Sequence, residues 1–475
     1  MIQALFVIFI IFFGVNFAKA GELRLSLEAS GLHVQGEISH LELREVSFLS
    51  SYAQFSGLEK RIQNLRFFNG QGSEVEYEEV SPGRFRTSEE IFRFSYTVNT
   101  KLSDQPADSS ISWTSESLGL LLLNDLVFLQ LQELGFKVSI ELADEWKSFS
   151  NCEKLSENVF LARRVSEAVF LIGKELRSSI FRINEKSFEI VFAGRWQFSD
   201  EEAVRSVKEI FSWYEKNIGK LEFARVQIFL IPFLQDNVFD RWNAQTLGAT
   251  VILVAAPNSF VTNAIDSFND RIRHELLHLW IPNSLGLSGK YDWFFEGFVV
   301  YQALKTGVLL GQIRFEDFLS AISRALSFAA KNRKSLIEAS VRRWHDSNRV
   351  VYSKGLVVAF LFDMKLMIKD EPGLEKVFRE LLKRYKLGSK HDGNLVIVNL
   401  LSEIDRETVK RYIEGTDEIK LEDVRHFGIE VRWEDDKAKL EITRNLSRKQ
   451  KNLLKMLGYN QTSHKNLRQM RVSSR

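Results

Sequence analysis

The segment RIRHELLHLW, Arg271 to Trp280, contains two of the eight histidines of the chain, His274 and His278. Side chains four residues apart on a helix lie one above the other, so both imidazoles could reach the same metal ion. Glu275 points roughly 100° away from His274, close enough to touch a water on that ion without being a ligand. Two nitrogen ligands with a base between them are what a zinc hydrolase needs. The alternative is a buried helix whose two histidines are unrelated.

A catalytic zinc site needs a third protein ligand and leaves a fourth position for water. Glu296 follows His278 after seventeen residues, within the apolar aromatic run YDWFFEGFVVYQAL, Tyr291 to Leu304. An unpaired carboxylate is costly to bury in such a run, so Glu296 needs a cation nearby. The spacing allows a turn and a second helix packed antiparallel to the first, which would bring Glu296 over the histidines. The other interpretation is that Glu296 lies at a helix N-terminus, where its charge interacts favourably with the helix dipole.

These motifs resemble a known group of enzymes. HELLHLW followed by FFEGFVVY resembles the gluzincin metallopeptidases, which pair His-Glu-x-x-His with a glutamate on the next helix. EASVRRWHDSNRVVYSKGLVVAFLFDM, Glu338 to Met364, is similar to the glycyl aminopeptidase family, metallopeptidase family sixty-one. The similarity to this family extends to YIEGTDEIKLEDV and to the earlier segments SISWTSESLGLLLLNDLVFL and LADEWKSFS. The resemblance runs, with gaps, from about Phe94 to Val424.

The resemblance implies a zinc-dependent metallopeptidase of the aminopeptidase type that acts on a peptide or protein substrate. One zinc ion (Zn2+) per chain would be held by His274, His278 and Glu296, and Glu275 would accept the proton of the attacking water. Tyr352, in VVYSKG at a helix entrance, would donate its O–H to the oxyanion formed from the attacked carbonyl. Judged by residue type alone, Tyr352 would instead be a core tyrosine with a satisfied hydroxyl.

One segment departs from the resemblance. Gluzincin aminopeptidases carry a glutamate before the edge strand of the sheet, and it holds the free amine of the substrate. Here the region reads RWNAQTLGATVIL, with no acidic residue between Asp240 and Asp266. Gln245 at that place would keep the shape and lose the charge, which predicts weak selection for a free amine.

The stretch GATVILVAAP, Gly248 to Pro257, reads as a further strand. The resemblance implies that it is the edge strand, which pairs with the extended backbone of the substrate. Gly248 and Ala249, at its start, are therefore predicted to bind substrate.

Hydrophobic periodicity predicts the elements that position these residues. Alternation of period two in LRLSLEASGLHVQGEI, IFRFSYTV and KVSIEL indicates an antiparallel β domain. SFEIVFAGRW, a helical stretch from Asp200 to Gly219, and ARVQIFLIPF indicate strand, helix and strand, where the catalytic domain begins. Beyond Gln312 the chain is strongly helical.

The expected fold class is α+β, and the resemblance implies a thermolysin-like α/β catalytic domain. The predicted divisions are a signal peptide at 1–20, an N-terminal β domain at 21–186, the catalytic domain at 187–310, a C-terminal α-helical domain at 311–425, and a short β segment with a basic tail at 426–475.

Composition excludes several classes of protein. Lys plus Arg number 64 against 62 for Asp plus Glu, so charge predicts no nucleic-acid partner. The single cysteine, Cys152, cannot form a disulfide framework or a multi-thiolate zinc site. A chain of 475 residues is too long for one core and suggests two or three domains.

The two ends of the chain carry distinct patterns. The apolar run Ala4 to Phe17 ends in Ala18-Lys19-Ala20, which predicts a signal peptide cleaved after Ala20 and export to a periplasm or the cell exterior. The alternative is an uncleaved membrane anchor. From Thr443 to Arg475 there are nine Lys or Arg and no acidic residue. Such a tail could contact an anionic surface, or could be a solvated end.

Two function classes follow. The first is an exported zinc peptidase that works by water activation. The second is a non-catalytic peptide-binding protein on the same fold. Because loss of turnover usually erases a ligand or the base first, the joint presence of His274, Glu275, His278, Glu296 and Tyr352 favours the enzyme.

Overall fold

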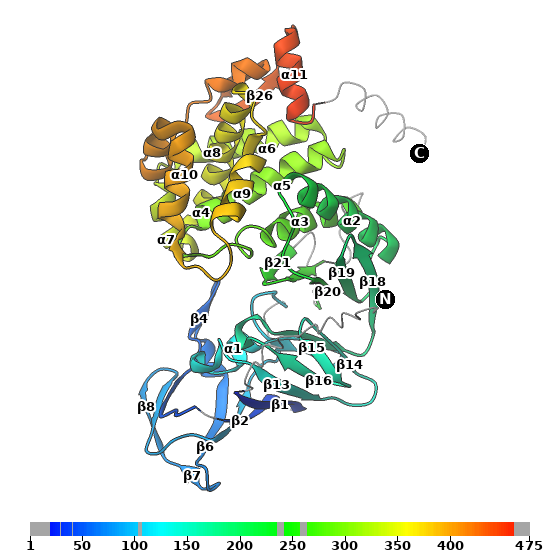
Figure 1. Ribbon diagram of the computed structural model, residues 1–475, viewed down its shortest axis with the longest axis vertical. Coiled ribbons are helices and arrows are strands. Elements are labelled where there is room, and N and C mark those ends of the chain that lie inside the picture. The colour runs from blue at the N-terminus through cyan, green and yellow to red at the C-terminus, as the bar shows by residue number, and fades with distance from the viewer. Residues whose placement is uncertain are drawn as a thin grey trace, which may run out of the picture. The chain divides into compact units, whose positions relative to one another are not determined.

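The computed structural model describes residues 20–28, 30–39, 41–102, 107–234, 242–256 and 264–459. These residues form two compact units, whose elements are labelled in Figure 1. The first holds the described residues up to Lys174, apart from a short segment that ends at Ser110. The second holds that segment and the described residues from Glu175 onward. The sequence placed the start of the catalytic domain slightly later, at residue 187.

The first unit is built from β-sheets, as the alternating pattern predicts. In β1, Leu23 and Leu25 are buried while Arg24 is exposed, so one face of the strand packs on the core. The largest sheet has the order β15 (Glu153–Ser156), β16 (Val159–Ala162), β13 (Phe136–Glu141), β1 (Gly21–Glu28), β2 (Gly31–Ile38), β10 (Arg93–Val98), β6 (Ile62–Phe68), β7 (Glu74–Val75). A second sheet has the order β11 (Trp113–Thr114), β12 (Leu118–Leu122), β17 (Val169–Gly173), β14 (Lys147–Ser150). A third pairs β3 (Glu45–Ser47), β9 (Arg84–Thr87) and β8 (Tyr77–Ser81). The pairings are antiparallel except that of β1 with β13, which is parallel.

The second unit begins with a mixed sheet. Its order is β18 (Leu176–Ile183), β19 (Lys186–Ala193), β20 (Arg225–Pro232), β22 (Thr250–Ala255), β21 (Trp242–Leu247). The three middle strands are parallel, and the two outer strands run antiparallel to their neighbours. The middle strands are almost entirely buried apolar runs, as expected where a parallel sheet is covered on both faces. The predicted order of strand, helix and strand is confirmed by β19, α2 (Asp200–Asn217) and β20.

The prediction of the edge strand is wrong by one strand. The expected edge, Gly248 to Pro257, contributes β22, which lies between β20 and β21. The short polar segment before it, WNAQTL, forms β21 at the edge of the sheet. The apolar character of VILVA indicated a strand, and that same character requires a position inside the sheet rather than at its rim.

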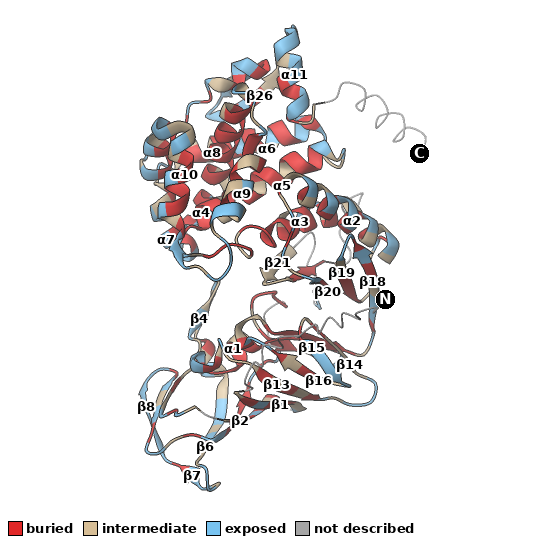
Figure 2. Ribbon diagram, viewed as in Figure 1, coloured by how far each residue is buried: buried red, intermediate tan, exposed pale blue. Residues whose placement is uncertain are grey.

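Helices fill the rest of the second unit. Ser199 and Glu202 form a capping box that starts α2, which packs against α3. The predicted helical domain is present, and Figure 2 shows that its central helices are buried over most of their length. The helices are α3 (Ala264–His278), α4 (Asp292–Phe295), α5 (Gly297–Leu309), α6 (Phe315–Lys331), α7 (Leu336–Val341), α8 (Asn348–Ile368), α9 (Gly373–Arg384), α10 (Gly393–Thr408), α11 (Arg448–Met456). Two strands, β25 (Ile429–Glu434) and β26 (Lys437–Ile442), form a hairpin, and β26 packs on α6.

The observed class is α+β, as predicted, with an N-terminal β unit, a sheet with helices, and a C-terminal helical region. Within the described residues, no helix has the length and apolarity to span a membrane. Residues 1–19 of the predicted signal peptide and residues 460–475 of the basic tail lie outside the described residues.

Candidate metal-dependent active site

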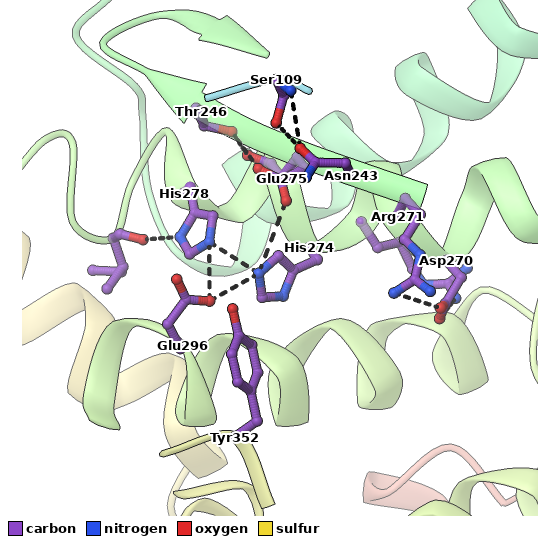
Figure 3. Close-up of polar contacts among 12 residues, drawn as sticks. Ser109, Asn243, Thr246, Asp270, Arg271, His274, Glu275, His278, Glu296 and Tyr352 are labelled. Carbon is purple, nitrogen blue, oxygen red and sulfur yellow. Dashed lines mark hydrogen bonds and ion pairs between the residues drawn. The ribbon is translucent and has the colours of Figure 1, made fainter. Parts of the chain in front are cut away.

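Helix α3 places His274 and His278 one turn apart, with both rings turned toward the same point (Figure 3). Their Nε2 atoms are 3.0 Å apart. The Nδ1 of His278 lies 2.9 Å from the carbonyl oxygen of Ile281, and a carbonyl can only accept. In the neutral imidazole Nδ1 therefore carries the proton, and Nε2 presents its lone pair to the site. A backbone partner that fixes the tautomer in this way is usual for metal-binding histidines.

Glu296 lies at the junction of α4 and α5 and faces the two histidines. Its Oε2 is 3.3 Å from His274 Nε2 and 3.7 Å from His278 Nε2. This oxygen is buried and faces both imidazoles. Ligand atoms about 2.0–2.1 Å from a tetrahedral zinc ion would be roughly 3.3 Å from one another, so the three atoms fit a shared zinc ion. The predicted ligand set is therefore brought together.

The charges of the metal-free site are coupled. Burial alone would lower the pKa of the His278 imidazole, but hydrogen bonding to Glu296 and the charge of Glu296 raise it to about 9. Burial would raise the pKa of Glu296, yet His274, His278 and Arg343 outweigh it and hold that pKa well below its ordinary value. Without a metal the site thus favours a carboxylate beside a protonated imidazole. Zinc would have to displace that proton in order to bind.

Glu275 has different neighbours from Glu296. Its Oε1 is 4.0 Å from His274 Nε2, which is farther than the Glu296 oxygen. Its Oε2 accepts a hydrogen bond of 2.7 Å from the hydroxyl of Thr246 on β21. One oxygen of Glu275 is thus held by the protein, and the other faces the metal position without reaching ligand distance. This arrangement suits a base that receives a proton from water.

Tyr352, five residues into α8, lies on the other side of the histidines. Its ring is tilted against that of His274, with 6.5 Å between the ring centroids. Burial, and then the charge of Glu296, hold the pKa of the phenol well above its ordinary value, while Arg343 acts in the opposite direction. The phenol therefore keeps its proton at neutral pH. It is available as a donor, which is the role predicted for it.

A cavity of about 420 Å³ opens beside these groups. Its charged and polar lining comes from His274, Glu275, Tyr352, Asp270 and Arg271. Apolar side chains from β21 and α5 complete it: Trp242, Ala244, Val300, Ala303, Leu304. The volume is in the range of ordinary ligand pockets. A substrate in this cavity would lie between the edge strand and the helices that carry the candidate ligands.

The three predicted substrate-binding residues lie near the site in different ways. Gln245 is on the edge strand β21, where it pairs with Ile252 of β22. Because side chains alternate along a strand, Gln245 shares a face with Asn243, whereas Thr246 faces Glu275. Gly248 and Ala249 form the turn between β21 and β22, and their carbonyls accept from Asn283 Nδ2 at 2.9 Å and Gln227 N at 3.1 Å. Their predicted role rested on an edge position that β21 occupies instead.

The short segment that ends at Ser110 belongs to this unit and supports the edge strand. The side chain of Asn243 donates to Asp108 Oδ2 at 2.5 Å and accepts from the backbone N–H of Ser109 at 3.0 Å. The Ser109 hydroxyl also contacts the Asn243 amide oxygen (Figure 3). Asp108 and Ser109 are both buried. A segment from the N-terminal half of the chain therefore fixes one face of β21.

Two residues close to the site were not found from the sequence. Thr246 belongs to the segment RWNAQTLGATVIL, in which an amine-binding carboxylate was expected. A threonine there is too common a residue to indicate a functional role. Arg343 contacts both Glu296 and Tyr352. In the sequence Arg343 is next to Arg342 in a segment that reads as a polar loop. The sequence therefore does not indicate that Arg343 is buried at the site while Arg342 is exposed.

Comparisons with known proteins concern the domain and its fold. Residues 202–417 match the Peptidase family M1 domain. An aminopeptidase N family protein from Idiomarina loihiensis has a similar structure, with a TM-score of 0.75 and 16% identity over 90% of this chain and 82% of its own. An M1 zinc metallopeptidase from Deinococcus radiodurans has a TM-score of 0.57 and 14% identity over 85% of this chain and 94% of its own. A mutant of that enzyme, equally similar, was solved with a Tyr-Ser-Ala substrate. No protein among curated sequences matches.

At these identities, the likeness to solved structures concerns the fold. The family match covers the segment that holds His274, Glu275, His278, Glu296 and Tyr352. It does not confirm the narrower resemblance to the glycyl aminopeptidase family, which stays a prediction. Residues 202–417 of this chain match the Peptidase family M1 domain, and the fold is similar to those of an aminopeptidase N family protein and an M1 zinc metallopeptidase.

Proposed function

We propose that this protein is an exported, zinc-dependent peptidase that hydrolyses peptide bonds. The observation that carries the proposal is the convergence of His274 Nε2, His278 Nε2 and the buried Glu296 Oε2 within 3.0–3.7 Å of one another. Glu275 and Tyr352 flank the same point and line the adjoining cavity. Ligands, base and oxyanion donor therefore occupy one site.

The chain's own residues supply three functions in the reaction. When bound, zinc would lower the pKa of water and polarise a carbonyl. Glu275 Oε1 would accept the proton of the attacking water and pass it on to the leaving amine, while Thr246 holds Oε2. The Tyr352 hydroxyl would donate to the oxyanion that forms on the attacked carbonyl. The outer edge of β21, the end strand of its sheet, would pair with the extended backbone of the substrate.

The predicted activity is aminopeptidase-like with weak restriction to free amino termini. The segment that would supply an amine-binding carboxylate has none between Asp240 and Asp266. The carboxylate of Asp270 in the cavity is paired with Arg273 at 3.1 Å and lies 4.0 Å from Arg271. A protonated amine would find little net negative charge there. We expect amino-acetylated and free peptides to have kcat/KM values within about tenfold of each other, roughly 1.4 kcal/mol.

The test is a metal analysis of the purified protein together with hydrolysis of a peptide library. About one zinc ion per chain and zinc-dependent cleavage are expected. Zinc binding without cleavage of any peptide would favour a non-catalytic peptide-binding protein. A preference for free over acetylated peptides on the order of a thousandfold would show that another carboxylate anchors the amine, and would restore a strict aminopeptidase.

Export is proposed from the leader and has its own test. The run that ends in Ala18-Lys19-Ala20 has the features of a cleavage site after small residues. Amino-terminal sequencing of the protein recovered from the periplasmic or secreted fraction should give Gly21 as the first residue. Recovery with the leader intact in the membrane fraction would indicate an anchor instead.

A further inference from the structure

Arg343 occupies a position that the proposed reaction does not yet use. It begins the π-helical turn Arg343–Ser347 between α7 and α8, and its side chain is turned inward with 9% of the residue exposed. Turns of this kind are rare and are often found at functional sites. A buried guanidinium requires partners for its charge and for its N–H groups.

The guanidinium has four polar partners, two of which belong to the candidate site. Its Nη2 lies 2.9 Å from Glu296 Oε1 and 3.0 Å from the hydroxyl oxygen of Tyr352. Its Nη1 donates to Asp292 Oδ1 at 2.9 Å, and its Nε donates to Asn348 Oδ1 at 3.2 Å. A single nitrogen therefore bridges the candidate metal ligand and the candidate oxyanion donor.

The direction of these hydrogen bonds decides what each partner can do. Arginine has donors only, so Glu296 Oε1 accepts and is engaged by the guanidinium. Oε2, the oxygen near both histidines, then remains as the single ligand atom. The Tyr352 oxygen also accepts from Arg343, so the one proton of the phenol is directed elsewhere. In the metal-free site burial raises the pKa of the phenol, and Glu296 attracts that proton and raises the pKa further. Tyr352 also lines the cavity in which a substrate oxyanion could accept the proton instead.

Packing holds the guanidinium in this orientation. Its Cζ lies over two aromatic rings, 4.5 Å from the centroid of Trp344 and 5.5 Å from that of Tyr352. Asp292 is itself buried and sits in the first turn of α4, immediately before the junction that carries Glu296. The planar fork of arginine matches this set of acceptors, and a lysine could satisfy only part of it.

We infer that Arg343 is a positioning residue that fixes Glu296 and Tyr352 as one unit, with one carboxylate oxygen facing the metal and the phenol proton facing the substrate. This inference rests on the proposed function for its catalytic consequence. It assigns no contact between Arg343 and the substrate.

The test compares Arg343→Met and Arg343→Lys with a matched control, Arg342→Met. Arg342 is the neighbouring arginine, half exposed, and its side chain pairs with Asp346 at 2.7 Å. Steady-state kinetics, and visible spectra of the cobalt-substituted proteins, are measured for all three variants and for Tyr352→Phe with and without Arg343→Met. The cobalt spectrum reports ligand geometry independently of turnover.

Arg343→Met should lower kcat by about 10²-fold and change KM by less than about threefold, because an oxyanion donor is misplaced while substrate contacts remain. The kcat of Arg343→Lys should be about tenfold higher than that of Arg343→Met. In the Tyr352→Phe background, Arg343→Met should cost at most about tenfold more, since the two residues act through one interaction. The cobalt spectrum should change in Arg343→Met and stay as in the wild type in Arg342→Met.

Additive losses for Arg343→Met and Tyr352→Phe, or an unchanged cobalt spectrum in Arg343→Met, would overturn the inference. If Arg343→Met fails to fold, the test uses Arg343→Lys, which retains the charge. A cobalt spectrum and a kcat equal to those of the wild type in Arg343→Lys would also overturn the inference. A wild type that binds cobalt but cleaves no peptide would contradict the proposed function alone, because the spectra still test Arg343. A wild type that binds neither zinc nor cobalt would contradict both.

Discussion

Glu275 and Glu296 lie within 4.0 Å of the same imidazole nitrogen, yet their surroundings give them different chemistry. Arg343 engages the outer oxygen of Glu296, and the inner oxygen faces the two imidazoles. Thr246 engages one oxygen of Glu275 and leaves the other at the edge of the site. A carboxylate oxygen that faces two imidazole nitrogens can share a metal ion with them, whereas a carboxylate held by a donor on one side can still accept a proton on the other.

This contrast predicts opposite effects of two matched substitutions. Glu296→Gln should weaken zinc binding strongly, because it removes a charged ligand atom. Glu275→Gln should retain about one zinc per chain and lower kcat by at least about 10³-fold, within the range for a general base. Zinc content and peptide hydrolysis are measured on the same preparations. Equal zinc content in both variants would mean that Glu296 is not a ligand.

Thr246 offers a second test at the same scale. Its hydroxyl donates to Glu275 Oε2 at 2.7 Å. Thr246→Val keeps the shape and removes the donor, so the base can rotate away from its working orientation. We expect kcat to fall by about tenfold, with zinc content unchanged, and Thr246→Ser to stay close to the wild type. Equal rates for the Val and Ser variants would show that the hydroxyl does not hold the base.

At the scale of elements, the ligands could be predicted because their signal is local. His274 and His278 share one helix, and Glu296 stands out as a carboxylate in an apolar run. The edge strand was assigned wrongly because apolar residues identify a strand but not its place in the sheet. The contact of Thr246 with Glu275, the bridge by Arg343 and the support of Asn243 by Asp108 join segments far apart in the chain. No local pattern encodes such contacts.

The helices that carry the site are joined by a buried ionic cluster. Lys305 on α5 donates to Asp363 on α8 at 2.9 Å and to Glu375 on α9 at 3.0 Å, and the lysine side chain is 2% exposed. Asp363 also accepts from the Tyr301 hydroxyl at 2.5 Å. The two carboxylates raise the pKa of Lys305 against the effect of burial, so the ammonium is charged at neutral pH. The cluster ties the helix that follows Glu296 to the helix that carries Tyr352.

Removing the cation should therefore destabilise the second unit. Lys305→Met leaves two carboxylates buried without their partner, which typically costs about 3–5 kcal/mol. Lys331→Met on α6 is the control, because its ion pair with Asp436 is exposed and 3.6 Å long. Urea unfolding followed by circular dichroism compares the two variants with the wild type. A loss for Lys305→Met no greater than that of the control would show that the cluster contributes little to stability.

At the scale of the whole molecule, metal binding, proton binding and folding of the catalytic unit are linked. In the metal-free protein the pKa of His278 is about 9, raised by Glu296 above the ordinary value of 6.5 in spite of burial. Because the folded value is the higher one, protonation of His278 stabilises the metal-free fold fully below about pH 6.5. That contribution is lost as the pH rises through about 9. Zinc requires the neutral imidazole, so its binding is opposed by the same proton.

The stabilities of the metal-free and zinc-loaded proteins should therefore diverge between pH 7 and pH 9. The metal-free protein should lose on the order of 1–2 kcal/mol over this interval as His278 gives up its proton. Zinc affinity should rise by up to about tenfold per pH unit, since one proton fewer has to be displaced. Urea unfolding with and without a chelator, and zinc titration against a competing chelator, measure the two effects. Glu296→Gln, without the charge that raises the pKa of His278, should show a weaker pH dependence in its metal-free form. A metal-free wild type whose stability stays constant from pH 7 to pH 9 would mean that His278 is already neutral at pH 7, and that zinc meets no proton there to displace.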